Sequence, residues 1–517
     1  MTLKQISGLG QKLALFLGLF GHHFGRSEPR ELLNVYVRGQ LSDLKQKNIE
    51  AIALRFKTPP RTLQRFVESI KWNEEEVRDQ CQRIVAAEHA YPDAIGIVDE
   101  SGTEKSGKAT VGVGRQWCGN LGKVENCVVG VHTVYAAPHF QCLLDSAVYL
   151  PEDWANDPER RKQSHVPEEV RFRTKPQIAS EQITRALRNG IRVSAWTFDE
   201  FYGRSAEFLD SLEAQKQVLV GEVPVDFHGW VRKPVIVRQA PESGGKSKKT
   251  RPRIVRRFPI SEVRNLVRYA PAFREQSWRR YRIKDTSKGP EVWEIKWSVF
   301  WRKDKAGRPT RRHCLIVARN VLTGEEKYFV ANRVPGERGV TVRWLLRVAF
   351  GRWPVEQCFR QAKHELGMDQ YQVRGWRCLH RHFYLAQLTH LFCARVRLEY
   401  DTSDPSAESP TVEDAPERAG RLTLEQVRGA VNAWFEATAM TPKKRRERYE
   451  TEINNIARHR TRNEQACRSH TQTRKEERLA DMNIDADRIR SCVPRAPCRS
   501  ADRPSCKQAT ADSASRM

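Results

Sequence analysis

The clearest amphipathic pattern along the chain lies between Pro354 and Gly367. Apolar side chains recur there at spacings of three and four residues, which predicts a helix with one buried face. This apolar stripe consists of Val355, Cys358, Phe359, Ala362 and Leu366. Proline suits the first turn of a helix, and glycine suits the left-handed position that ends one. Glu356, Arg360 and Lys363 recur at spacings of four and three, which predicts a second face with one carboxylate and two cations.

Between residues 91 and 222, short apolar runs alternate with helical patterns, which is typical of an α/β sheet. Residues 94–98 and 193–198 predict buried strands that end in Asp99 and Asp199. The other expected elements are strands at 126–137, 140–150 and 218–220 and helices at 177–189 and 205–212. Three strands, a helix, a strand, a helix and a strand is the order of an RNase H-like sheet. In that sheet the two aspartates would be neighbours at the carboxyl ends of their strands.

The first 90 residues carry helical patterns only. Ser42 is placed to cap a helix through residue 56, a second helix is expected over 60–70, and Asn73 is placed to cap a third through residue 90. Short helices with a tight joint fit either a helix-turn-helix or a plain helical bundle. The segment also carries basic side chains that suit DNA contact, namely Lys45, Lys47, Arg55, Lys57, Arg61 and Arg65.

Residues 223–340 are rich in strand patterns and in arginine and lysine. Trp293, Trp297 and Trp301 alternate with polar residues, which predicts a strand with an aromatic face. That face would either bury the three rings in a small sheet or offer one of them to a nucleic acid base. A glycine-rich basic loop within this segment contains Lys248, Lys249 and Arg251.

These patterns divide the chain into seven parts. We expect a helical DNA-binding domain (1–90), the first part of the α/β core (91–222), a β-rich insertion (223–340) and the second part of the core with the Glu356 helix (341–400). A disordered linker (401–421), a basic helical region (422–490) and a disordered tail (491–517) would follow.

Composition narrows the choice of partner. The chain has 517 residues, and 90 Lys and Arg against 63 Asp and Glu give a net charge of +27. Such a balance favours a polyanionic partner, most simply nucleic acid. The longest apolar run, residues 13–20, is too short to cross a membrane, which takes about 20 residues. The 12 cysteines form no C-x-x-C pair, which fits reduced thiols rather than a zinc site.

Arg352, Glu356 and Lys363 are separated by three and then six residues, and this spacing resembles the R-E-K part of the Y-R-E-K signature of insertion-sequence DDE transposases. Ala349 stands where that signature has its tyrosine. Four further segments are similar to the catalytic-domain sequence of this family, namely "IVDESGTEKSGK", "YLPEDW", "FDEFYG" and "MDQYQVRGWRCLHRHF". The resemblance covers roughly residues 30–400.

The resemblance implies that Asp99, Asp199 and Glu356 form a catalytic triad that binds two Mg²⁺ ions, with Mn²⁺ as a substitute. Two such ions stabilise the attacking and leaving oxygens of a phosphodiester. Arg352, Arg360 and Lys363 would bind DNA, and Lys363, about 10 Å along the helix from the glutamate, would contact a backbone phosphate. The insertion, with Trp293, Trp297, Trp301 and its basic loop, would hold the element end. Glu100, Glu200 and Asp145 are weaker candidates for the acids.

The resemblance further implies a bacterial cytoplasmic, nucleoid-associated protein that acts as a homodimer on double-stranded DNA. It would cut the terminal inverted repeats of a mobile element and join them to target DNA. Two alternatives stay open. One is a non-catalytic DNA-binding protein that retains the fold, and the other is an RNase H-like nuclease without strand transfer. A covalent mechanism through Ser101 or Tyr202 is disfavoured, because neither has a histidine activator in the sequence.

Overall fold

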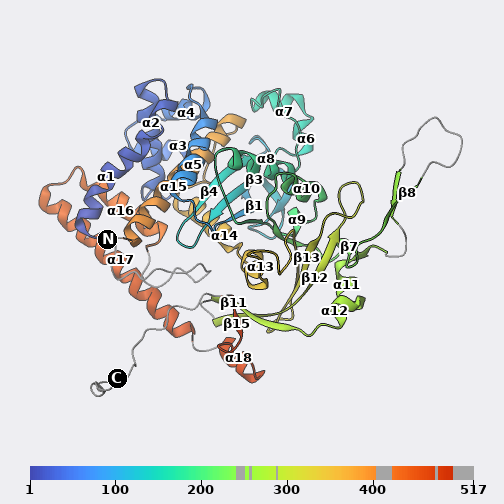
Figure 1. Cartoon of the computed structure of the whole chain (residues 1–517). Helices are drawn as coiled ribbons and strands as arrows, with labels where there is room; N and C mark the ends of the chain where they lie inside the picture. The colour runs from blue at the N-terminus through green and yellow to red at the C-terminus, as the bar shows by residue number, and fades with distance from the viewer. Residues whose placement is uncertain (240–250, 255–258, 287–288, 403–421, 472–474, 493–517) are drawn as a thin grey trace, which may run out of the picture.

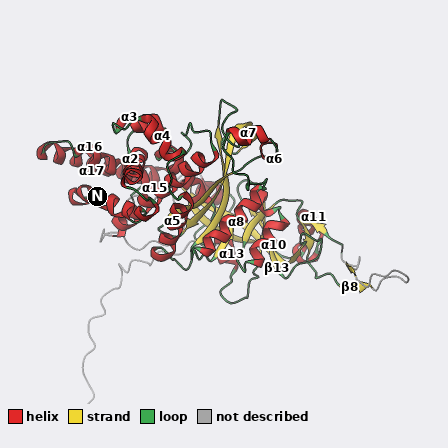
Figure 2. Cartoon of the chain, turned by 90° about the horizontal axis from the view of Figure 1, so that it is seen from above, coloured by secondary structure: helices red, strands yellow, loops and turns green. Residues whose placement is uncertain are grey.

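The computed structural model describes residues 1–239, 251–254, 259–286, 289–402, 422–471 and 475–492. It contains helices and two main sheets, as the α/β expectation requires (Figure 1). Figure 2 shows the strands lying between groups of helices, with the β8 ribbon at one end. No helix among the described residues is long and apolar enough to span a membrane. Nine cysteines have side chains that the structure describes, and all nine are free and buried.

The first sheet is built around two long strands, β1 and β3. Its strands are β1 (Ile95–Glu104), β2 (Gly114–Cys118), β3 (Lys123–Ala136), β4 (Gln141–Val148) and β5 (Ala195–Thr197). β1 pairs antiparallel with β3 on one side and parallel with β5 on the other. The far edge of β3 pairs with β2 near its start and with β4 near its end. β1 is therefore an interior strand, and its side chains 97 and 98 are fully buried.

Two expectations about β1 and β5 meet different outcomes. The prediction that the first strand ends at Asp99 is wrong, because β1 continues through five more residues to Glu104. Polar residues can extend a strand where a neighbouring strand supplies the hydrogen bonds, and β3 does so along all of β1. The fourth strand does end just before Asp199, at Thr197.

The second sheet contains most of the expected β-rich insertion. Its strands are β6 (Val220–Val223), β7 (His228–Trp230), β10 (Ser261–Glu262), β11 (Arg279–Thr286), β12 (Gly289–Arg302), β13 (His313–Asn320), β14 (Glu326–Ala331) and β15 (Arg490–Ser491). The order is β10-β7-β12-β13-β14-β6, with β11 on β12 and β15 on β11. β8 (Ile236–Gln239) and β9 (Arg251–Ile254) form a separate ribbon, and α11 (Val263–Tyr269) and α12 (Pro271–Arg274) follow it. A single bridge between Trp196 and Leu219 links the two sheets.

The amino-terminal helices pack against the long helix α15 (Trp376–Thr402). They are α1 (Leu3–Gly18), the short η1 (Gly21–His23), α2 (Ser27–Leu41), α3 (Ile49–Arg55), α4 (Pro60–Glu68) and α5 (Glu74–Glu88). Asn73 caps α5 as expected, but Ser42 ends α2, and Asn48 caps α3 instead. The Arg381 guanidinium of α15 donates to the carbonyl of Ile70 (2.9 Å), and Tyr36 hydrogen-bonds His382 (2.7 Å). These helices share one continuous hydrophobic core with the first sheet.

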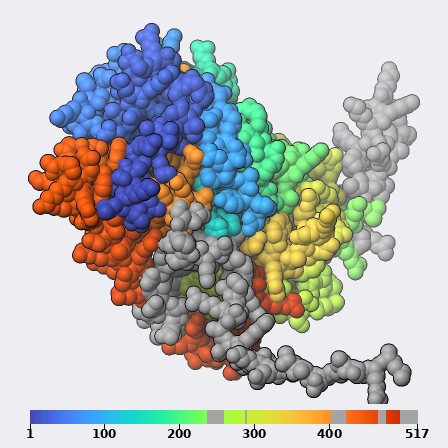
Figure 3. Space-filling model, turned by 60° about the vertical axis from the view of Figure 1, so that its left-hand side comes forward, coloured from blue at the N-terminus to red at the C-terminus, as the bar shows by residue number. Residues whose placement is uncertain are grey.

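The remaining helices connect and cover the sheets. They are α6 (Glu152–Ala155), α7 (Pro158–Gln163), α8 (Lys175–Arg188), α9 (Glu200–Gly203), α10 (Ala206–Ala214), α13 (Val342–Ala349), α14 (Trp353–Arg360), the π-helical turn η2 (Gln361–Glu365), α16 (Leu424–Ala437), α17 (Pro442–Thr471) and α18 (Lys475–Asp481). Figure 3 shows α16 and α17, in orange, beside the blue amino-terminal helices. The expected linker and tail lie almost wholly outside the described residues.

Candidate active site

Asp99 lies on β1, and Asp199 follows the end of the neighbouring strand β5 at the same level of the first sheet. The parallel register pairs Ile95 with Ala195 and Ile97 with Thr197, and its continuation places Asp99 beside Asp199. Asp99 points from the middle of β1, and its side chain is only 15% exposed. The Asp199 carboxylate accepts a hydrogen bond from the Tyr202 backbone N–H (3.3 Å) and so caps α9. The sheet therefore brings the two predicted acids together.

Arg352 is the cation that faces this pair. It stands at the start of α14, and its Nη2 lies 3.1 Å from Asp99 Oδ2 and its Nη1 3.7 Å from Glu222 Oε2. Burial raises the pKa of Asp99 to about 6; the Arg352 guanidinium opposes that rise and the Asp199 charge adds to it. The site thus holds a carboxylate whose ionised form is disfavoured unless positive charge is close by.

Glu356 stands one helical turn beyond Arg352 on α14. Its side chain is exposed, whereas Val355 and Cys358 beside it are fully buried and anchor the helix against the sheet. Further along, the Lys363 ammonium donates to the Gly102 carbonyl of β1 (2.8 Å). Arg352 and Lys363 therefore tie the helix to β1 at two points. Glu356 lies between them in sequence, on the exposed side of the helix, and within the described residues it does not form a cluster with Asp99 and Asp199.

The expectation that Glu356, Arg360 and Lys363 share one face is wrong. Glu356 and Arg360 are exposed, but Lys363 is buried, with 7% of its surface exposed. The cause is the π-helical turn η2, because its wider winding rotates Lys363 toward β1. Burial lowers the pKa of Lys363. Its ammonium is bonded to the Gly102 carbonyl, so the expected contact with a DNA phosphate is not open to it in this structure.

The weaker acidic candidates have other partners. Glu100 pairs with Lys175 (2.8 Å), and burial raises the pKa of Glu100. Asp145 is completely buried and accepts a hydrogen bond from Arg185 Nε (2.8 Å), which marks it as a structural ion pair. Glu200 is exposed on α9. Glu100 and Glu200 each directly follow one of the two aspartates, and the Asp199 charge contributes to the raised pKa of Glu100.

The carboxylates assigned to the site are of the chemical type that binds a divalent cation. Asp99, Asp199 and Glu356 offer carboxylate oxygens, the ligands that Mg²⁺ prefers. The pKa of Asp99 stays raised although the Arg352 guanidinium opposes the rise, so further positive charge beside Asp99 would favour its ionised form. Within the described ranges, no three His, Cys, Asp or Glu side chains stand together at metal-binding distances.

The predicted aromatic strand is β12, and its three tryptophans differ. Trp293 is 2% exposed and packs against Phe350 (ring centroids 4.9 Å apart), so its expected role in stacking on DNA is corrected to a core role. Trp297 and Trp301 are half-buried. Trp297 lines a cavity of about 550 Å³ together with Gln276 and Arg279.

The other expected DNA contacts have mixed positions. Arg360 is exposed on α14, and Arg352 is engaged with Asp99. Lys248 and Lys249 lie outside the described residues. Arg251 begins β9, but its side chain is not among those that the structure describes.

Glu222, which the sequence patterns did not single out as a site residue, faces Arg352 from β6 and also pairs with Lys327 (3.2 Å). A signal was present, because Glu222 follows the apolar residues of a predicted strand just as the two aspartates do. Tyr202 was considered only as a nucleophile. It is fully buried, and its pKa is raised well above the ordinary value by burial and by the carboxylates of the site, Glu100, Asp99 and Asp199.

Comparisons with known proteins identify the family of the chain. The family model described as DDE superfamily endonuclease matches residues 19–290, a span that includes both aspartates. A curated relative from Microchaete diplosiphon, named as a probable transposase for insertion sequence element IS701, is 29% identical over 172 residues. That alignment covers 33% of this chain and 42% of the relative, so the chain matches about two fifths of the relative's length.

Proposed function

The chain belongs to the DDE superfamily endonucleases, whose family model matches just over half of its length, and from this premise we propose that it is an insertion-sequence transposase. The curated relative supports the step from endonuclease to transposase. In this proposal the protein binds the terminal inverted repeats of its element, cleaves one strand at each end and joins the freed ends to target DNA. Its excess of 27 positive charges suits such a substrate.

The proposal includes an RNase H-like catalytic core. The support is the sheet order β4-β3-β1-β5, continued toward β6 by the Trp196–Leu219 bridge. In that order three antiparallel strands are followed by a parallel one, and the fourth strand lies beside the first. The second sheet is then an insertion between β6 and the helix that carries Glu356.

The observation that carries the proposal is the side-by-side placement of Asp99 and Asp199, with α14 running along the same strand. We assign Asp99, Asp199 and Glu356 as the catalytic carboxylates. They would hold Mg²⁺, and the bound ions would stabilise charge on the attacking and leaving oxygens of the phosphodiester. Arg352 holds the Asp99 carboxylate in position while the site is being filled, and Glu222 is its second partner.

No side chain of the protein needs to act as a nucleophile in this scheme. Water attacks the first phosphodiester, and the freed 3′-OH attacks the target strand. Tyr202 supports this choice, because a fully buried phenol with a raised pKa cannot reach a DNA phosphate. Ser101 is also buried, 7% exposed, which removes the other candidate for a covalent intermediate.

The test uses the full-length protein and duplex DNA that carries the ends of its own element, with Mg²⁺ added. We expect nicking at the end, followed by strand-transfer products when target DNA is present. We expect a nicking rate lower by at least about two orders of magnitude, with end binding retained, in each of the single variants Asp99→Ala, Asp199→Ala and Glu356→Ala. Nicking without joined products would favour a nuclease, and binding without nicking would favour a non-catalytic DNA-binding protein. An active Asp199→Ala enzyme would overturn the assignment.

A further inference from the structure

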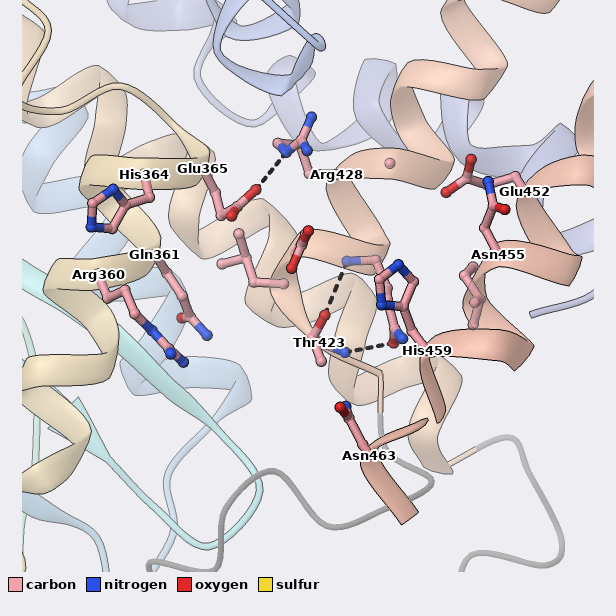
Figure 4. Close-up of a pocket in the computed structure, with 15 residues that line it drawn as sticks. Arg360, Gln361, His364, Glu365, Thr423, Arg428, Glu452, Asn455, His459 and Asn463 are labelled. Carbon is pink, nitrogen blue, oxygen red and sulfur yellow. Dashed lines mark hydrogen bonds and ion pairs between the residues drawn. The ribbon is translucent and has the colours of Figure 1, made fainter. Parts of the chain in front are cut away.

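A polar groove continues the exposed face of the Glu356 helix. It has a volume of about 550 Å³ and lies between the π turn, α16 and the middle of α17 (Figure 4). Arg360, Gln361 and His364 form the wall on the catalytic side. Asn455, His459 and Asn463 face them from α17. Arg360 stands one helical turn from Glu356, and both are exposed, so the groove begins next to the catalytic glutamate.

The α17 wall is a stretch of helix that packs on little else. Ile456 is the last buried residue of α17 among those whose side chains the structure describes, and none of the side chains 457–463 is buried. A helix that is polar all round and keeps its form usually bridges two packed parts of a protein. Figure 1 shows α17 in that position. Its first half packs on α1 and α16, and beyond its end α18 packs on β12 while β15 pairs with β11.

The bridging stretch carries positive charge that the protein does not neutralise. On the helix, Arg460 and Arg462 flank the groove-facing side chain of His459. Within the described part of the chain, neither arginine has a carboxylate within ion-pair distance, and Arg462 is exposed. This contrasts with Arg448 near the start of α17, which pairs with both Glu436 (2.6 Å) and Glu452 (3.1 Å).

Carboxylates also line the groove, but two of the three are already paired. Glu365 is bonded to Arg428 (2.7 Å), and Glu452 to Arg448 (3.1 Å). Only Glu425, at the start of α16, is exposed in the groove without an ion pair among the described residues. Arg360 and the two α17 arginines therefore leave the groove and its rim with a net positive charge, alongside neutral hydrogen-bonding groups.

We propose that this groove binds the phosphodiester backbone of the DNA strand that enters the Glu356 site, with α17 as its outer wall. The inference rests on the proposed function. Arginine, histidine and asparagine side chains are suited to phosphate oxygens, and such contacts fix the position of DNA without reading its sequence. The groove holds the strand next to the carboxylates, and the anchored ends of α17 keep the outer wall in place.

The test compares two double variants of the full-length protein. Arg460→Gln with Arg462→Gln removes the two cations that flank His459 on the rim of the groove. Lys443→Gln with Lys444→Gln removes two exposed cations at the other end of the same helix. Affinity for a fluorescein-labelled DNA duplex is measured by anisotropy over a range of KCl concentrations. Each neutralised phosphate contributes about −0.9 to the slope of log affinity against log salt concentration. The slope of the Arg460/Arg462 variant should therefore be shallower by about 1.8, and its affinity near 0.1 M salt should be lower by a factor of roughly tens. The Lys443/Lys444 control should keep most of the wild-type affinity and most of the wild-type salt slope. Circular dichroism verifies that both variants keep their helix content.

The outcomes separate this inference from the proposed function. Equal losses in the two variants would show that only net charge matters, and no loss in either would show that DNA runs elsewhere; both overturn the groove. A protein that binds DNA through Arg460 and Arg462 but never nicks it would keep the groove and remove the transposase proposal. A wild-type protein without affinity for DNA would overturn both.

Discussion

Replacing Asp99 by asparagine should make the metal-free protein more stable while it abolishes catalysis. In the folded protein the pKa of Asp99 is raised from 3.8 to about 6, first by burial and also by Asp199. The folded state therefore binds more protons than the unfolded chain between pH 3.8 and about 6, and wild-type stability falls as pH rises through that window. Each pKa unit corresponds to about 1.36 kcal/mol, which sets a ceiling of about 3 kcal/mol above pH 6. At pH 7.5 we expect Asp99→Asn to raise the free energy of unfolding by roughly 1–3 kcal/mol. Loss of the Asp99 charge does not leave Arg352 without a partner, because Glu222 remains close to it.

The assay is urea unfolding of the full-length protein, followed by tryptophan fluorescence at pH values from 4 to 8. The advantage of Asp99→Asn should be near zero at pH 4 and complete above pH 6. Two other carboxylates serve as controls. Glu356→Gln alters an exposed side chain and should change stability by less than about 0.5 kcal/mol. Asp145→Asn breaks the buried pair with Arg185 and should destabilise by roughly 3–5 kcal/mol.

A second measurement connects the stability effect to metal binding. Mg²⁺ that binds only the folded state should raise the unfolding midpoint of the wild type, and this response should be lost in Asp99→Asn. If Asp99→Asn destabilises the protein at pH 7.5 as Asp145→Asn does, then Asp99 and Arg352 form a structural ion pair. That result would contradict the reasoning from burial and charge.

Three further outcomes are expected. Trp293→Ala should lose roughly 3–5 kcal/mol of stability and lower the melting temperature, because the ring is buried. Trp297→Ala should leave the melting temperature nearly unchanged and slow the processing of the cut DNA end. The reverse pattern would contradict the assignment of Trp293 to the core. Deleting residues 1–90 should give aggregated protein rather than a folded core with weaker end specificity, as measured by size-exclusion chromatography, because those helices share the hydrophobic core of the sheet. Lys363→Met should keep the fold and at least half of the DNA affinity of the wild type, since its ammonium contacts the Gly102 carbonyl; a large change in the salt slope would show that Lys363 reaches a phosphate.

The parts of the fold that depend on local pattern were predictable from sequence. The apolar stripe of the Glu356 helix, the left-handed glycine at 367 and the strand before Asp199 are all present. Each is set by side chains within a few residues of one another. The order of strands and helices in residues 91–222 also followed from alternating patterns, which is why Asp99 and Asp199 could be expected as neighbours.

The features that were missed depend on distant partners. β1 continues past Asp99 because β3 supplies hydrogen bonds along its whole length, and no local signal reports that support. The π turn that buries Lys363 forms where the helix meets Gly102, far away in sequence. The aromatic alternation of β12 correctly predicted a strand face, but only the packing against Phe350 shows that Trp293 belongs to the core.

The parallel pairing of β15 with β11 has a consequence for how the protein is made. Tyr281 aligns with Arg490, so this pair cannot form until the segment that contains Arg490 has left the ribosome, long after β11 itself. The first sheet and the other strands of the second sheet can assemble earlier, since domains fold as units during synthesis from the amino-terminal side. The long loop that the late pair closes carries a high entropic cost, which delays its formation further. A nascent chain can therefore hold its two aspartates and Glu356 in place before β15 fixes the part of the chain that follows α17.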